Sequence, residues 1–188
     1  MIEIVRYSQL LDRLHQRSEE QERISAEIDA IFFEASNTKS FVDEAARTAF
    51  RERWLGRYLN NHRDCAFIAL ENGADVAGYV VGALEDPALS AEFADVWHVA
   101  AFAHLSRRYP AHLHINIAAH HRNRGLGHAL ISRFVDDVRS ADVAGVHVVT
   151  GAGARNVGFY QRNGFWEAGR LTRASTDVVF LGRDLSGT

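Results

Sequence analysis

The chain has little of the two residues that cross-link or stiffen a backbone. Its 188 residues include a single cysteine, Cys65, and two prolines. One cysteine can form neither an intrachain disulfide nor a CxxC metal or redox pair, so we expect a reducing, cytoplasmic environment. The scarcity of proline and the lack of low-complexity runs exclude collagen-like and linker-type chains.

Long apolar runs and an excess of basic charge are also missing. The sequence contains no stretch of about 18 apolar residues, and residues 1–7 lack the apolar core of a signal peptide. Lysine and arginine number 21 against 24 acidic residues, which gives a formal net charge of −3. No basic field is available to hold a nucleic-acid backbone. We therefore expect neither a membrane partner nor a nucleic-acid partner.

What the sequence does contain is an ordinary globular composition, with 47% hydrophobic and 24% charged residues. This length suits one domain, and neither a linker nor an internal repeat divides it. We predict a single α/β domain over residues 1–188. In residues 1–60 a short alternating strand precedes segments whose apolar residues keep helical spacing, and we predict helices over 8–14, 19–35 and 41–59.

The remaining residues alternate between strand and helix patterns. Cys65–Leu70 and Val76–Leu84 flank Asn72-Gly73, a strong signal for a hairpin of two antiparallel strands. Apolar spacing predicts the later elements, which are a helix at 87–108, a strand at 112–117, a helix at 125–139, a strand at 143–150, a helix at 155–162, and strands at 165–170 and 177–181.

The turn from Arg122 to Gly127 separates a predicted strand from a predicted helix. The first backbone N–H groups of a helix lack intrahelical partners, and the positive end of the helix dipole favours an anion. Gly125 and Gly127 let the backbone approach phosphate oxygens, and Arg122 and Arg124 add charge. The spacing matches neither a P-loop nor a Rossmann fingerprint, so we predict a different phosphate-bearing ligand.

Two motifs resemble the GCN5-related N-acetyltransferase (GNAT) family. The family signature [Arg/Gln]-x-x-Gly-x-[Gly/Ala] is matched by Arg122, Gly125 and Gly127, and the family's later helix resembles the segment in which Tyr160 stands four residues before Gly164-Phe165. The resemblance covers about residues 65–181, with residues 1–60 as the variable N-terminal part. Many members carry an asparagine seven residues before the tyrosine; here that position is Gly153, and Asn156 is the expected substitute.

The resemblance implies a mixed, mostly antiparallel sheet of six to seven strands, flanked by helices and splayed between the fourth and fifth strands. It also implies acetyl-CoA as acyl-donor cosubstrate, with the pyrophosphate on the turn and the pantetheine arm paired like an added strand. The cofactor-binding residues expected on this basis are Ile117, Arg122, Asn123, Arg124, Gly125, Gly127, His128, Asn156 and Tyr160.

The implied reaction is direct attack of a primary amine on acetyl-CoA in a ternary complex. An alkylammonium with a pKa of about 10.4 has no lone pair, so a base or a water path must take its proton. His114 is the first candidate because an imidazole titrates near the working pH; Glu71 and Glu85 are the alternatives. Tyr160 is expected to protonate the departing thiolate or to donate a hydrogen bond to it.

Other assignments are open. A catalytically inactive CoA-binding or sensing module of the same fold is the alternative function, because a phosphate cradle indicates binding and not turnover. The acceptor is either a small-molecule amine or a protein lysine, and a homodimer is the expected assembly. His112, His114, His120 and His121 lack an acidic or cysteine partner at a recognised metal spacing, so the sequence predicts no metal.

Overall fold

The computed structural model describes residues 1–174 and 176–186. Seven strands form a mixed sheet in the order β1-β2-β3-β4-β5-β7-β6. The chain divides into two compact units, the first formed by residues 1–82 and 114–134 and the second by residues 83–113 and the chain from 135 onward. The α/β class and each predicted strand are confirmed, with small shifts of the boundaries. The single-domain boundary of 1–188 stays a prediction.

The first unit contains an antiparallel arrangement of β1 (Ile2–Arg6), β2 (Phe67–Glu71) and most of β3 (Asp75–Ala83). Between β2 and β3, Asn72 and Gly73 have φ values of 53° and 76°. These φ values, with the Ala74 amide donating to the Glu71 carbonyl over 3.0 Å, make a tight turn between two antiparallel strands, so the predicted hairpin is confirmed. The last four residues of β4 (Ala111–Ile117) also belong to this unit.

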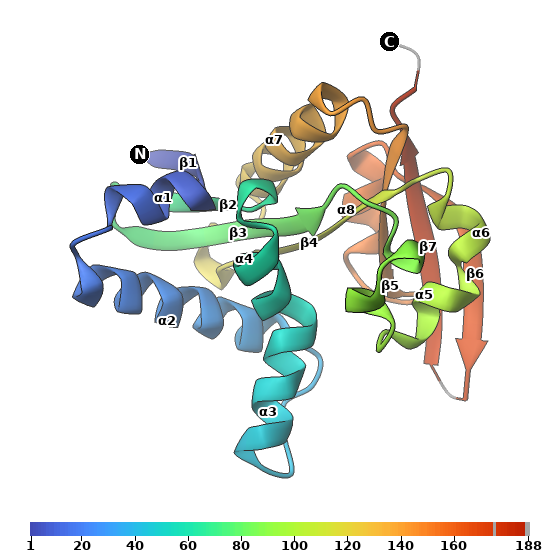
Figure 1. Ribbon diagram of the computed structural model, residues 1–188, viewed down its shortest axis with the longest axis horizontal. Helices are drawn as coiled ribbons and strands as arrows, with labels where there is room; N and C mark the ends of the chain where they lie inside the picture. The colour runs from blue at the N-terminus through green and yellow to red at the C-terminus, as the bar shows by residue number, and fades with distance from the viewer. Residues whose placement is uncertain (175, 187–188) are drawn as a thin grey trace. The chain divides into compact units, whose positions relative to one another are not determined.

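The helices of the first unit are α1 (Tyr7–Arg13), α2 (Ser18–Ala35), α3 (Glu44–Arg51) and α4 (Arg57–Asn61). Figure 1 shows α2 running beside β3. The Val76 amide donates to Glu27 Oε2 over 2.7 Å, and Arg23 donates to the Ala74 carbonyl over 3.2 Å, so α2 is tied to the hairpin. The buried face of α2 is the predicted apolar stripe of Ile24, Ile28, Ile31 and Phe32.

The prediction of one continuous helix over 41–59 is wrong. The helix begins only at Glu44, because the Asp43 carboxylate caps it by accepting from the Ala46 amide over 2.7 Å. A π-helical turn, η1 (Glu52–Gly56), then separates α3 from α4. A Cβ at Gly56 would collide with the Glu52 carboxylate, so the small residue makes room for this side chain inside the turn.

The second unit contains β5 (Gly145–Gly151), β6 (Trp166–Arg173), β7 (Thr176–Asp184) and α8 (Val157–Arg162). β7 is antiparallel to both β5 and β6, and the first residues of β4 pair in parallel with β5. The core of the unit includes Phe102, Tyr109, Val178 and Phe180. The helix α7 (Leu126–Ser140) contributes residues to both units.

The predicted helix over 87–108 is also wrong. The structure has two 3₁₀ turns, η3 (Pro87–Leu89) and η4 (Ala91–Phe93), followed by the short helices α5 (Trp97–Ala101) and α6 (Ala103–Ser106). The side chains of Asp86 and Ser90 accept hydrogen bonds from the amides of Ala88 and Glu92. Such local bonds compete with helix propagation, so this segment forms separate short turns and helices although its apolar residues have helical spacing.

Over the described residues, no helix combines the length and the apolar character that a bilayer crossing requires.

Candidate functional site

The turn that follows β4 lies in the first unit and faces solvent. A 3₁₀ turn, η5 (Ala119–His121), leads into Arg122, Asn123, Arg124 and Gly125, all exposed, and α7 begins at Leu126. Asn123 and Gly125 have φ values of 61° and 82°. A Cβ at Gly125 would meet no heavy atom within 4 Å, so the glycine serves backbone conformation and leaves the turn open.

Two backbone donors at this turn are available to an anion. The first bond of α7 runs from the Ala129 amide to the Gly125 carbonyl over 3.1 Å. The amides of Leu126 and Gly127 precede it and, within the part of the chain that the structure describes, have no acceptor of the i−4 type. Gly127 is half-buried and His128 is exposed. The start of α7 thus combines open N–H groups with the positive end of a 15-residue helix.

Arg122 holds the turn in place. Its Nε donates to the Ile117 carbonyl over 2.9 Å, and its Nη2 lies 3.0 Å from Glu34 Oε1. The guanidinium therefore joins the end of β4, the turn and the end of α2. The predicted cofactor residue Ile117 has its carbonyl engaged in this contact. Arg124 is exposed as well and is the second cation of the turn.

His114 lies half-buried on β4 among aromatic side chains. Its Nε2 is 3.2 Å from the Tyr58 hydroxyl, and its ring centroid lies 5.3 Å from that of Tyr58 and 5.6 Å from that of Trp54. Trp54 comes from the π-helical turn, a type of distortion that is frequent at functional sites. Sequence reasoning missed both aromatic partners, because their helical spacing indicated only a core position.

The neighbouring polar residue of β4, Asn116, is held in the same manner. Its Nδ2 donates to the Tyr79 hydroxyl over 2.8 Å. Burial raises the pKa of Tyr79, so this hydroxyl stays protonated.

The alternative bases, Glu71 and Glu85, lie elsewhere on the chain. Glu71 ends β2 and lies beside His121, and Glu85 is an exposed residue after β3.

The predicted residues Asn156 and Tyr160 lie together in the second unit. Asn156 precedes α8, and its Oδ1 accepts a hydrogen bond from Thr150 Oγ1 over 3.0 Å. The Tyr160 amide donates to the Asn156 carbonyl over 3.0 Å. Tyr160 is 3% exposed, and burial raises its pKa, so the phenol is protonated near neutral pH. Gly153 is exposed and has open space around it.

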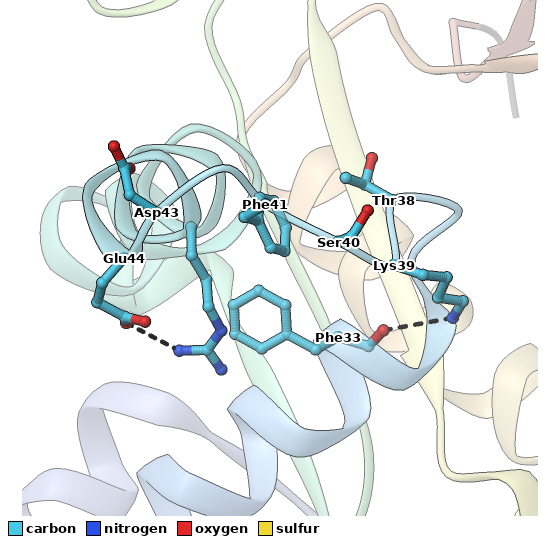
Figure 2. A pocket seen from close by; sticks show the side chains of 8 residues that line it. Phe33, Thr38, Lys39, Ser40, Phe41, Asp43 and Glu44 are labelled. Carbon is cyan, nitrogen blue, oxygen red and sulfur yellow. Dashed lines mark hydrogen bonds and ion pairs between the residues drawn. The ribbon is translucent and has the colours of Figure 1, made fainter.

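A pocket of about 330 Å³ lies between the end of α2 and the start of α3 (Figure 2). Its aromatic wall includes Phe33, over whose ring Arg47 lies at 3.9 Å. Arg47 also pairs with Glu44 at 3.1 Å, and Lys39 donates to the Glu34 carbonyl over 2.7 Å. None of the site residues predicted from the sequence lines this pocket.

The structure therefore groups the predicted residues by unit. His114, Ile117 and the turn 122–128 form one continuous strand-turn-helix segment in the first unit, and Asn156 and Tyr160 share the α8 region of the second. The first group offers backbone N–H groups at the start of a helix, the cations of the turn, and an imidazole that contacts the Tyr58 hydroxyl. The second group supplies a protonated phenol.

In fold, the chain is similar to several solved structures. The crystal structure of SsHAT has a TM-score of 0.69 and 20% identity, with 97% of this chain and 98% of that chain covered. A GNAT-family protein from Desulfovibrio desulfuricans has a TM-score of 0.61 and 21% identity, covering 98% and 99%. The yncA protein from Salmonella typhimurium, solved with its cofactor acetyl-CoA, has a TM-score of 0.57 and 16% identity, covering 100% and 95%.

At these identities the structural similarity shows the fold. No curated protein matches the sequence significantly. Residues 22–165 match the model of the acetyltransferase (GNAT) family, whose members use acetyl-CoA. The matched range includes the turn after β4 as well as Tyr160 and Phe165, on which the resemblance in the sequence was based. The chain belongs to the GNAT family of acetyltransferases.

Proposed function

We propose that this acetyltransferase binds acetyl-CoA with the pyrophosphate on the turn 122–128 and transfers the acetyl group to a primary amine. The observation that carries the proposal is the geometry of the turn. Positive φ at Asn123 and Gly125 opens the backbone, and the amides of Leu126 and Gly127 lack helical acceptors among the described residues. The acetyl-CoA in the structure of the similar yncA protein supports the choice of ligand.

The pantetheine arm has a matching partner in β4. The parallel ladder with β5 contains the pairs Ala111–Val146 and His112–His147, and β4 continues to Ile117. Strand residues beyond a ladder present N–H and C=O groups that the amides of pantetheine can satisfy as an added strand. The residues of β4 that we assign to this role are His114 to Ile117.

The proposed reaction is one acyl transfer. The amine nitrogen attacks the thioester carbonyl, the N–C bond forms, and the C–S bond breaks. His114 takes the proton that the amine loses, and Tyr160 gives its proton to the departing thiolate. Each role rests on the residue's own surroundings: the Tyr58 hydroxyl orients the His114 ring, and burial keeps Tyr160 protonated. Glu71 and Glu85 are the alternative bases.

The first experiment measures acetyl-CoA binding by titration calorimetry. Gly127 stands at the start of α7, where a carboxylate is favourable for the helix but repels pyrophosphate. We expect Gly127→Glu to lose binding, with Gly127→Gln as the control for size without charge. If neither acetyl-CoA nor CoA binds the wild-type protein, the proposed cofactor site is refuted.

Two glycines with similar backbone conformation and open surroundings allow a more specific test. Gly125 and Gly73 have φ values of 82° and 76°, and a Cβ at either position would meet nothing within 4 Å. Substitution by glutamate therefore imposes similar backbone strain, about 1–2 kcal/mol, at both. We expect Gly125→Glu to weaken acetyl-CoA binding at least ~100-fold through charge repulsion and lost approach, and Gly73→Glu to leave it unchanged.

Turnover is tested by release of free CoA thiol in the presence of small amines and lysine peptides. Tyr160→Phe is expected to keep acetyl-CoA affinity and to lower kcat about 100-fold, a typical loss for a general acid. Preference among the amines would identify the acceptor class. Tight binding without thiol release from any amine would instead support the inactive CoA-binding module.

A further inference from the structure

Glu71, His120 and His121 bring three metal-binding side chains together in the first unit, and we call them the His-His-Glu cluster. One ligand atom from each lies within 4.8 Å of the other two. His121 Nε2 is 3.3 Å from Glu71 Oε2, and the two imidazole rings have centroids 4.3 Å apart. We propose that this cluster is a binding site for a divalent transition metal, with zinc as the best match.

The fold positions these residues from distant parts of the sequence. Glu71 is the last residue of β2, and the histidines occupy the 3₁₀ turn η5 that follows β4. The turn is fixed by two backbone bonds, from the Ala118 amide to the Ala77 carbonyl of β3 over 3.0 Å and from the His121 amide to the Ala118 carbonyl over 2.9 Å. The cluster therefore lies on the sheet. Glu71 is part of β2, and the turn that carries the two histidines is hydrogen-bonded to β3.

The distances suit a small, four-coordinate ion. Zinc binds histidine nitrogen and carboxylate oxygen at about 2.0–2.2 Å, so two ligand atoms of a tetrahedral site lie roughly 3.3–3.6 Å apart. The His121–Glu71 separation of 3.3 Å meets this requirement already. His120 is exposed, so a change of its rotamer closes the remaining gap. A fourth position is then open to water.

The ligand types select the class of metal. Two imidazoles and one carboxylate suit zinc and its neighbours, whereas calcium and magnesium prefer oxygen ligands alone. The His121 side chain is only 7% exposed and that of Glu71 is 40% exposed, so the ligand pair is partly shielded from water. An ordinary His121–Glu71 ion pair explains the 3.3 Å contact but gives no role to His120, and this difference makes the proposal testable.

The test is a zinc titration of the full chain, free of any tag, in competition with a chromogenic chelator. We expect one zinc ion per chain and at least a tenfold loss of affinity in each of His120→Ala, His121→Gln and Glu71→Gln. His104→Ala is the control, because His104 is also exposed and lies outside the cluster. His120→Ala is the most informative variant, since an exposed side chain can be removed without disturbing the fold.

A second measurement does not depend on the chelator. Because zinc would bind only the folded cluster, it should raise the melting temperature of the wild type and of His104→Ala but not of His120→Ala. Absence of stoichiometric binding, or equal losses in His120→Ala and His104→Ala, would overturn the proposal. Gly127→Glu should retain zinc binding, which separates this site from the proposed acetyl-CoA site.

Discussion

The two halves of strand β4 place their polar residues in different surroundings. In the half that belongs to the second unit, His112 is 6% exposed, its ring lies 4.7 Å from Phe93, and its partner across the ladder is His147. In the half that belongs to the first unit, His114 and Asn116 are half-buried, and each contacts a tyrosine hydroxyl. One strand therefore uses histidine for packing at one end and for polar contacts at the other.

The ladder partner His147 shows how strongly burial changes an imidazole. It is stacked on Phe180 with ring centroids 4.4 Å apart, and its Nδ1 lies 2.5 Å from the Tyr109 carbonyl. Burial lowers the pKa of His147 to about 4, against the effect of the bond to Tyr109. Burial therefore decides the protonation state of His147, which stays neutral near pH 7.

The largest expected effect is acid destabilisation through His147. In the unfolded chain an imidazole protonates near pH 6.5, whereas folded His147 resists protonation down to about pH 4. Its contribution to stability is complete above pH 6.5 and is lost as the pH falls from 6.5 to 4, by about 3 kcal/mol in all. Urea unfolding at a series of pH values measures this loss.

The variant that tests this assignment is His147→Asn, whose amide can still donate to the Tyr109 carbonyl. It should flatten the pH dependence of the unfolding free energy between pH 6.5 and 4, and His104→Asn should not. Part of the slope should persist, because burial also lowers the pKa of His98 to about 4. An unchanged slope in His147→Asn would contradict the account of the buried half.

The second prediction contrasts the two histidines of β4: His114 is the proposed base, whereas His112 is a packing residue. His114→Gln should lower kcat about 100-fold, as loss of a general base does, with little change in acetyl-CoA affinity. His112→Gln should lower stability by about 1–3 kcal/mol through disturbed packing and leave kcat within about twofold. Steady-state kinetics and urea unfolding of both variants measure the contrast. Loss of kcat in both variants, or in neither, would contradict the assignment of His114 and favour Glu71 or Glu85 as the base.

A smaller effect is expected at Tyr58, which we assign as a positioning residue for His114. Tyr58→Phe keeps the aromatic contact but removes the hydroxyl 3.2 Å from Nε2. We expect kcat to fall roughly fivefold to tenfold, KM for acetyl-CoA to stay constant, and the acidic limb of the pH–rate profile to move.

The control for this tyrosine is Tyr109→Phe. The Tyr109 hydroxyl is buried and makes no hydrogen bond to the described residues, so its removal should be neutral or slightly stabilising and should leave kcat unchanged. An unshifted pH–rate profile in Tyr58→Phe would contradict the assignment of the Tyr58 hydroxyl as the group that positions His114.

The smallest effect concerns Asn116. Its bond to the buried Tyr79 hydroxyl should contribute about 1 kcal/mol to the free energy of unfolding. A double-mutant cycle with Asn116→Ala and Tyr79→Phe, followed by urea unfolding, isolates this pairwise contribution. A coupling energy near zero would mean that the polar half of β4 is held by the backbone alone.

Local chemistry explains which parts of the fold were predictable. The hairpin at Asn72-Gly73 and the turn at Gly125 follow from the tolerance of these residues for positive φ. The helix over 87–108 was predicted wrongly because the side chains of Asp86 and Ser90 bond to nearby amides, which spacing alone does not reveal. The π-helical turn at Glu52–Gly56 was also missed, because a helical repeat of apolar residues does not indicate where a helical turn widens.

Short sequence motifs identified the family, and they predict phosphate binding at the turn after β4 and catalytic roles for His114 and Tyr160. These follow from short motifs in which the chemistry lies within a few residues. The tertiary structure alone decided which histidines are buried and which polar partners they meet. Tyr58 and His114, like Glu71 and His121, are far apart along the chain, and they come together only when helices and strands pack around a common sheet.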